Sequence, residues 1–224
     1  MNGFTQPPVT VDGVVFQLAG GVLHVLLIQR GADPFRGVWA LPGGYISGDE
    51  TTKQALRRVL RGKAGLSTKD YSLTDQLYTF DMPAVRDPRG HAISVAYMVL
   101  AKNISLSEAP QLETPTFFPV ADLPKLAYDH GDIIRAAHER LRGKITYTNI
   151  VFGLLPELFT LTQLQMAYEA IIGHPLDKRN FRKKFLSLGL IGATGEHYLD
   201  GAHRPALLYR FKQQALQALS RSFE

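Results

Sequence analysis

The chain has 224 residues, of which 45% are apolar and 20% are charged, enough to bury one large core or two smaller ones. The absence of cysteine excludes a disulfide framework, a thiolate zinc site and a cysteine nucleophile. The net charge of +5 and the pI near 9.4 weakly indicate an anionic partner. The first 17 residues hold no Lys or Arg, and no apolar run reaches the roughly 18 residues of a membrane span. We therefore expect a cytoplasmic protein without a membrane partner.

The pattern up to residue 144 predicts more strands than helices. Apolar runs over 9–18 and 22–30 flank Gly20-Gly21 and predict a hairpin. Further strands are predicted over 73–80, 92–101 and 116–120. Helices are predicted over 50–63, where Gly65 ends the helix, and over about 132–141. Arg86-Asp87-Pro88-Arg89 is expected to be a turn first and a ligand contact second.

The character of the chain changes after residue 144. Residues 145–177 contain no Lys or Arg, whereas five of the seven residues 178–184 are basic. We therefore predict two domains, 1–144 and 145–224. Helices are predicted over 147–155, over about 161–172 with Thr160 as N-cap, and from Lys178 onwards, followed by a hairpin. This order is typical of a winged helix-turn-helix.

The segment from Gly44 to Leu66 resembles the box that defines the Nudix hydrolases. Its matching residues are Gly44, Glu50, Arg58, Leu60, Gly65 and Leu66. The resemblance implies an α/β/α sandwich with a mixed sheet, so the expected fold class is α+β multidomain, a Nudix-like sandwich followed by a winged helix-turn-helix. Three later acids of the box are replaced here by Val59, Gly62 and Lys63.

Those three positions lie on one helix face, where the family holds its metal. Mg²⁺ needs carboxylate ligands, and Val, Gly and Lys have none. Without the metal the usual hydrolysis loses its water activation. We therefore expect no metal site, no catalytic residues and little or no hydrolysis, in a cleft that still binds a nucleoside diphosphate.

Eight residues are candidates for that ligand site: Arg30, Arg36, Trp39, Gly43, Gly44, Glu50, Arg58 and Lys63. The glycines permit close backbone approach, the arginines could clamp phosphate, and Lys63 could replace the metal's charge. Each has a simpler interpretation. Glu50 with Arg58 is more often a structural ion pair, Trp39 serves equally well in the core, and a lone loop arginine is usually only solvated. Tyr128-Asp129-His130 could assist catalysis, but we favour a helix cap.

The basic stretch that begins at Lys178 is the candidate nucleic-acid site. As the third helix of a helix-turn-helix it would enter the major groove, with Arg179 and Asn180 suited to guanine and adenine edges, although the helical position of Asn180 also suits a contact with the DNA backbone. Phosphate contacts are expected from Lys178, Arg182, Lys183, Lys184, Thr162 and Gln163, and Arg204 is a candidate for the DNA backbone or the minor groove. A merely solvated basic face is the alternative.

Both halves together resemble the Nudix-related transcriptional regulators of NAD metabolism. The second half carries Tyr147-Thr148, Phe159-Thr160-Leu161, the basic stretch 178–185 and Arg204-Pro205-Ala206-Leu207-Leu208-Tyr209. The resemblance implies a homodimer that binds double-stranded operator DNA, represses genes of NAD biosynthesis or salvage, and takes ADP-ribose as effector with no required cofactor. Two alternatives remain: a pyrophosphatase that uses Glu50 or Asp129 as a displaced base, and an inactive scaffold whose winged helix binds protein.

Overall fold

The computed structural model describes residues 7–81, 87–106, 115–199 and 205–219. The chain divides into two compact units, one of residues 1–17 and 24–137 and one of residues 18–23 and 138–224. The unit boundary lies inside a helix, a few residues before the predicted one, and the assignment of domains to 1–144 and 145–224 stays a prediction. In the described ranges no helix is long and apolar enough to cross a bilayer.

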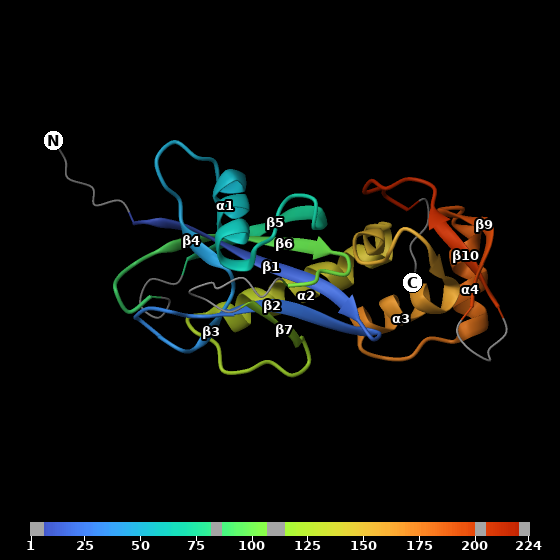
Figure 1. Ribbon diagram of the computed structural model, residues 1–224, viewed down its shortest axis with the longest axis horizontal. Coiled ribbons are helices and arrows are strands. Elements are labelled where there is room, and N and C mark those ends of the chain that lie inside the picture. Colours follow the sequence, from blue (N-terminus) through green and yellow to red (C-terminus); the bar gives the residue numbers. More distant parts are fainter. Residues whose placement is uncertain (1–6, 82–86, 107–114, 200–204, 220–224) are drawn as a thin grey trace. The chain divides into compact units, whose positions relative to one another are not determined.

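A mixed sheet forms the centre of the first unit (Figure 1). Its strands are β1 (Val9–Ala19), β2 (Val22–Gln29), β3 (Trp39–Ala40), β4 (Gly43–Tyr45), β5 (Tyr71–Asp81), β6 (Ile93–Ala101) and β7 (Pro115–Pro119). The order β3-β2-β1-β6-β5 is completed by β4 on β1 and β7 on β2. Parallel pairing of β1 with β6 makes the sheet mixed, and the predicted strands and hairpin are confirmed.

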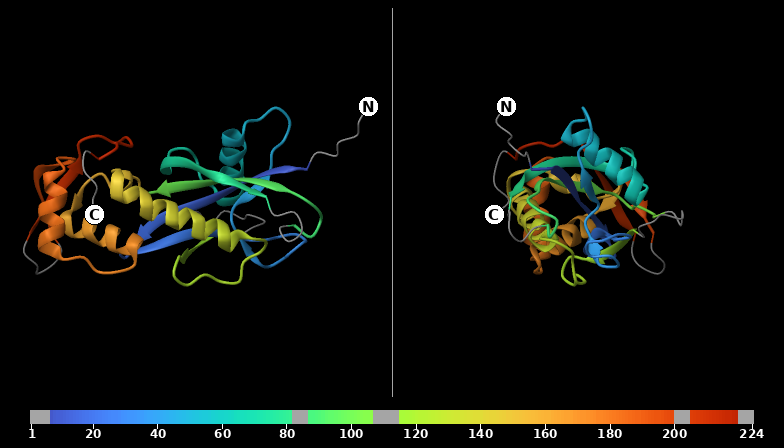
Figure 2. Two further views of the ribbon diagram at one scale, coloured as in Figure 1. Left: turned by 180° about the vertical axis from the view of Figure 1, so that it is seen from behind. Right: turned by 90° about the vertical axis from the view of Figure 1, so that its left-hand side faces the viewer.

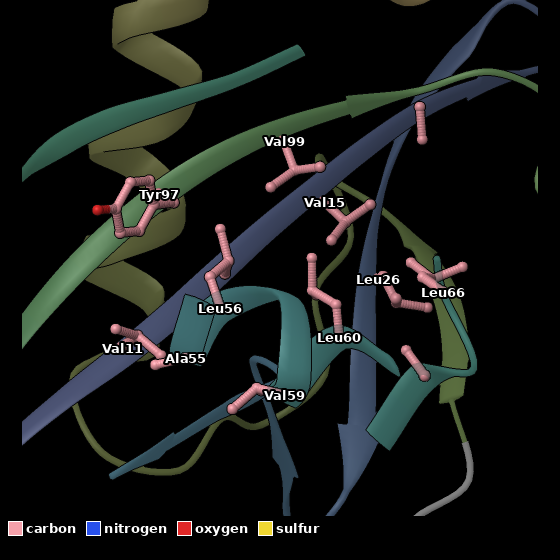
Figure 3. Packing of buried hydrophobic residues seen from close by; sticks show 12 residues of the cluster. Val11, Val15, Leu26, Ala55, Leu56, Val59, Leu60, Leu66, Tyr97 and Val99 are labelled. Carbon is pink, nitrogen blue, oxygen red and sulfur yellow. The ribbon is translucent and has the colours of Figure 1, made fainter. Parts of the chain in front are cut away.

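Helix α1 (Thr52–Ala64) covers one face of this sheet. It begins at Thr51, which forms a capping box with Gln54, and it ends at Gly65, whose φ of 68° is the left-handed conformation that glycine adopts without strain. The buried side chains of α1 include Leu56, Val59 and Leu60, which belong to one cluster with Val11, Leu26 and Tyr97 of the sheet (Figure 3). Helix α2 (His130–Tyr147) lies behind the strands in Figure 3. Its residues up to Ala137 belong to the first unit, which gives the three expected layers.

Helix α2 (His130–Tyr147) is longer than its sequence predicts. It runs through Gly143, where we expected a boundary, because its buried side recurs at Ile133, Ala137, Leu141 and Ile145. A glycine inside a helix costs only about 1 kcal/mol, less than burying two large aliphatic side chains contributes. The prediction of a separate helix over 147–155 is wrong, since only the 3-10 turn η1 (Ile150–Gly153) follows.

After the end of α2, the second unit contains two more helices and a small sheet, the elements of a winged helix (Figure 2). Helices α3 (Leu161–Ile172) and α4 (Lys178–Ser187) precede strands β9 (Ile191–Tyr198) and β10 (Ala206–Phe211), and β8 (Phe159–Thr160) completes a three-stranded sheet of order β8-β10-β9. Aromatic side chains fill its core: Phe159 lies 5.1 Å from Phe211, and Tyr168 lies 5.3 Å from Phe181, between ring centroids. Thr160 caps α3 as predicted, Gly173 ends α3 in the left-handed conformation, and Asp177 caps α4.

Candidate ligand cavity and nucleic-acid interface

A cavity of about 260 Å³ opens in the first unit beside the box. Residues from β1, β4, the end of α1, the loop after β2 and the segments before β6 and α2 line it. Of the eight predicted ligand residues it brings together Arg30, Gly43, Gly44 and Lys63. The other four, Arg36, Trp39, Glu50 and Arg58, are not among its lining residues. As ligand contacts, all eight stay predictions.

Glu50 and Arg58 form an ion pair that joins the loop of the box to α1. Arg58 donates from Nε and Nη2 to the two carboxylate oxygens of Glu50, with the shorter contact at 2.5 Å, and Nη2 also donates to the Tyr45 carbonyl at 2.8 Å. The hydrogen bond from Arg58, with those from Ser47, lowers the pKa of Glu50 from 4.5 to about 2. The pair therefore has a structural role, which its simpler interpretation anticipates.

The residues at the positions of the missing acids do not fit a divalent cation. Val59 is 3% exposed and packs in the core cluster (Figure 3). Gly62 has no side chain and faces open space, and Lys63 brings a positive charge to the cavity. Among the described residues no group of three or more His, Asp or Glu side chains could hold a metal ion. The donor set for Mg²⁺ is therefore missing from this face.

A buried polar cluster at one wall of the cavity was not found by sequence reasoning. Asp12, Ser94 and His130 are at most 4% exposed. Ser94 Oγ donates to Asp12 Oδ2, the Leu41 amide donates to His130 Nδ1 at 2.8 Å, and His130 Nε2 lies 3.6 Å from Asp12 Oδ1. Because Nδ1 accepts, the ring proton is assigned to Nε2, facing the carboxylate. Asp12 is the only Asp, Glu, Lys or Arg between positions 9 and 29. A single charge inside two apolar strands is the sequence signal that could have indicated a buried polar cluster.

The two glycines of β4 are required by the chain itself. A Cβ on Gly43 would lie 2.0 Å from Asp12 Oδ1, and one on Gly44 would lie 3.1 Å from a methyl carbon of Val59. Both residues also line the cavity. Close packing therefore accounts for them before any ligand is considered.

Aromatic rings hold two of the three cationic side chains that line the cavity in the described part of the chain. Arg30 lies 5.0 Å from the centroid of the Tyr128 ring, and Arg89 lies 5.6 Å from that of Tyr45. Arg30 also donates from Nε to the Pro34 carbonyl at 2.8 Å. Arg89, for which the sequence predicted a turn first and a ligand contact second, lines the cavity, as do Tyr45 of the box and Tyr128, for which a helix cap was favoured.

The remaining loop and strand candidates lie elsewhere. Arg36 is exposed. Trp39 is half-buried in β3 and packs edge-on against Phe118, with 4.7 Å between ring centroids, a contact that favours its core interpretation. His130, expected as part of a helix cap, is the first residue of α2 and also lines the cavity.

Helix α4 exposes most of its basic residues and buries its aromatic ones. Phe181 and Phe185 are buried, while Lys178, Arg179, Asn180 and Lys183 are exposed and Arg182 and Lys184 half-buried. Asp177 caps the helix by accepting from the Asn180 amide at 2.7 Å. After this cap, the first turn of α4 contains no acid. Its cations lie at the positive end of the helix dipole, where positive charge is unfavourable. The dipole and the cations therefore both attract an anionic partner.

Two predicted phosphate contacts are joined to each other. Arg182 Nη2 donates to Thr162 Oγ1 at 3.0 Å and links α4 to the start of α3. The Gln163 side chain accepts from the Thr160 amide within the capping box at 2.8 Å. Arg204 lies outside the described residues. The DNA contacts of all these residues stay predictions.

The fold and these two surfaces define a class of protein in which a Nudix domain with a degenerate box precedes a winged helix. Residues 6–137 match the family described as NUDIX domain, and residues 151–211 match the NrtR DNA-binding winged helix domain. The chain belongs to the NrtR group of Nudix proteins. It is 36% identical to the ADPR responsive transcriptional repressor NtrR of Acinetobacter baylyi, over 95% of this chain and 85% of that protein.

Other known proteins are similar to the whole chain or to one part. Shewanella oneidensis NrtR, crystallised with a 27mer DNA, has 34% identity and a TM-score of 0.82 over 96% of this chain and 99% of its own. Its NUDIX domain with ADP ribose has 35% identity and a TM-score of 0.56 over 62% and 90%. The ADP-ribose pyrophosphatase of Methanocaldococcus jannaschii is 36% identical over 59% of this chain and 73% of its own.

Proposed function

We propose that the protein is a transcriptional repressor that binds operator DNA through its winged helix and ADP-ribose through its Nudix domain. The observation that carries the proposal is the match to NrtR in its DNA complex over nearly the whole of both chains. Similarity to an ADPR responsive repressor at 36% identity supports the same role. Genes of NAD biosynthesis or salvage are the proposed targets.

In this proposal α4 reads the operator. Arg179 and Asn180 contact base edges, while Lys178, Arg182, Lys183 and Lys184, with Thr162, Gln163 and Arg204, contact phosphates. Exposure of Arg179 and Lys183 and the anion-attracting first turn of α4 support these roles.

The cavity of the first unit is the proposed effector site. Arg30 and Lys63 face it and supply positive charge for a diphosphate, and Gly43 and Gly44 form part of its wall. The volume of about 260 Å³ lies slightly below the usual range for small-molecule pockets, of about 300 to 1,000 Å³. Glu50 and Arg58 act from outside this lining, by holding the loop of the box against α1, and Arg36 and Trp39 stay candidates for contact with the ligand.

The repressor would act as a homodimer, in which each subunit contributes one recognition helix. The two helices would contact two half-sites of the operator that lie about 34–36 Å apart, or a multiple of that spacing. ADP-ribose can act as a switch only if it binds the DNA-competent and DNA-incompetent states with different affinities. Such coupling is typically about 1–3 kcal/mol.

The test is capture of genomic fragments by the purified protein with and without ADP-ribose, followed by anisotropy titration of the recovered sites. We expect specific fragments, strong salt dependence and a change in affinity when ADP-ribose is added. Absence of binding to any duplex at low salt would contradict the proposal and favour a winged helix that binds protein.

Hydrolysis of ADP-ribose is the second candidate, favoured by the similarity to the archaeal pyrophosphatase. The lack of carboxylates at positions 59, 62 and 63 argues against it. Steady release of AMP and ribose 5-phosphate with Mg²⁺, abolished by Glu50→Gln, would establish the enzyme. We expect no such release.

A further inference from the structure

Among the described residues, the charged side chains that line the cavity cancel formally. Three are cations, Arg30, Lys63 and Arg89, and three are carboxylates, Asp12, Asp33 and Asp87. The diphosphate of ADP-ribose is anionic, so each carboxylate in the cavity repels it. The repulsion is reduced where the carboxylate is hydrogen-bonded by groups other than the cations that would bind the diphosphate.

Asp12 is held by groups other than the cations of the cavity, whereas Asp87 is held by one of those cations. The Asp12 carboxylate faces Ser94 and His130. The Asp87 carboxylate instead takes both hydrogen bonds of the Arg89 fork, from Nε to Oδ1 at 2.9 Å and from Nη2 to Oδ2 at 2.6 Å. Such a paired geometry is the one in which guanidinium also holds phosphate.

The exposure of the pair makes exchange of partners feasible. The Asp87 side chain is only 8% exposed, but Arg89 is 47% exposed, so a ligand in the cavity can reach the guanidinium. Arg89, followed by the weaker influence of Arg30, lowers the pKa of Asp87. The carboxylate therefore remains ionised and competes for Arg89 at any physiological pH.

We propose that Asp87 is an internal competitor for the effector, occupying Arg89 in the empty cavity and weakening the binding of a diphosphate ligand. This inference rests on the proposed function of the cavity. It assigns to Asp87 the role of setting the effector concentration at which the protein responds: a stronger hold on Arg89 requires more effector.

Asp87→Asn is the informative variant, because it removes the charge but keeps the turn. The Arg89 amide donates to Asp87 Oδ1 at 3.0 Å, and an asparagine oxygen can accept the same bond. Asp87→Ser offers a second acceptor in case the amide is not tolerated. The matched control is Asp81→Asn, which removes one charge from the same unit at a residue that does not line the cavity.

Calorimetric titration of the full chain with ADP-ribose tests the inference. We expect Asp87→Asn to bind about three- to tenfold more tightly at 0.1 M salt, and Arg89→Gln to bind more weakly. The gain should shrink at 1 M salt, where the Debye length falls from about 10 Å to about 3 Å. Asp81→Asn should bind like the parent chain.

The inference is overturned if Asp87→Asn and Asp87→Ser bind no more tightly than Asp81→Asn, or if the gain is the same at both salt concentrations. It is also overturned if Arg89→Gln binds like the parent chain. A parent chain that binds no ADP-ribose at all would instead refute the proposed function, so the two failures are distinguishable.

Discussion

Substitution of Gly43 by alanine tests whether the cavity wall depends on the buried Asp12 cluster. The new Cβ would lie 2.0 Å from Asp12 Oδ1 and 3.0 Å from the Val11 carbonyl. The Asp12 carboxylate must move by more than 1 Å to restore a van der Waals distance from the new Cβ. This movement weakens its hydrogen bond with Ser94 and its contact with His130. Overpacking costs about 1–3 kcal/mol and a weakened bond to a buried charge about 1.5–3 kcal/mol. Because the two effects overlap, we expect a loss of about 2–4 kcal/mol in the free energy of unfolding.

Thermal unfolding of the first unit measures this loss. About 3 kcal/mol corresponds to a decrease of about 6–12 °C in the midpoint for a chain of this size, and ADP-ribose affinity should fall with it. Gly62→Ala is the control, since nothing lies within 4 Å of its Cβ in α1, and it should raise stability by up to about 1 kcal/mol. Equal midpoints for Gly43→Ala and the parent chain would refute the packing argument.

Three further outcomes are expected. Arg179→Ala should weaken a specific operator by about 1–3 kcal/mol in an anisotropy titration; equal losses on unrelated duplexes would exclude base readout. Because the folded-state pKa of Glu50 is lowered to about 2, its ionised form stabilises the fold above about pH 4.5, and this contribution disappears as the pH falls towards 2. Glu50→Gln should therefore flatten the melting midpoint against pH in that window, and an unchanged profile would contradict the ion-pair assignment. Val59→Glu should cost about 3 kcal/mol or more by burying a carboxylate, without creating Mg²⁺-dependent hydrolysis; a stable, active variant would disprove this.

Local signals predicted most secondary-structure elements. Gly65 and Gly173 end helices in the left-handed conformation, and Thr160 with Gln163 starts one, because these residues act on their own backbone. The same kind of signal was misleading at Gly143. There the burial of Leu141 and Ile145 along α2 outweighs the local cost of glycine.

The candidate site was predictable only in part. Gly43, Gly44 and Lys63 belong to one stretch of sequence and were found through the box. Arg89 and Asp87 lie after β5, in a stretch for which the sequence predicted a turn first and a ligand contact second, and no local pattern connects them with the box.

The amino-acid sequence by itself determined which metal ligands are missing, because a helix turn with Val59, Gly62 and Lys63 offers no side-chain oxygen in any fold. It also determined that Arg179, Arg182 and Lys183 point away from the face of Phe181 and Phe185, since helical periodicity alone sets that arrangement. Only the tertiary structure decided which charges meet. The contacts of Asp12 with His130 and of Asp87 with the cavity depend on strand order and on loop positions, which arise from long-range packing rather than from local preference.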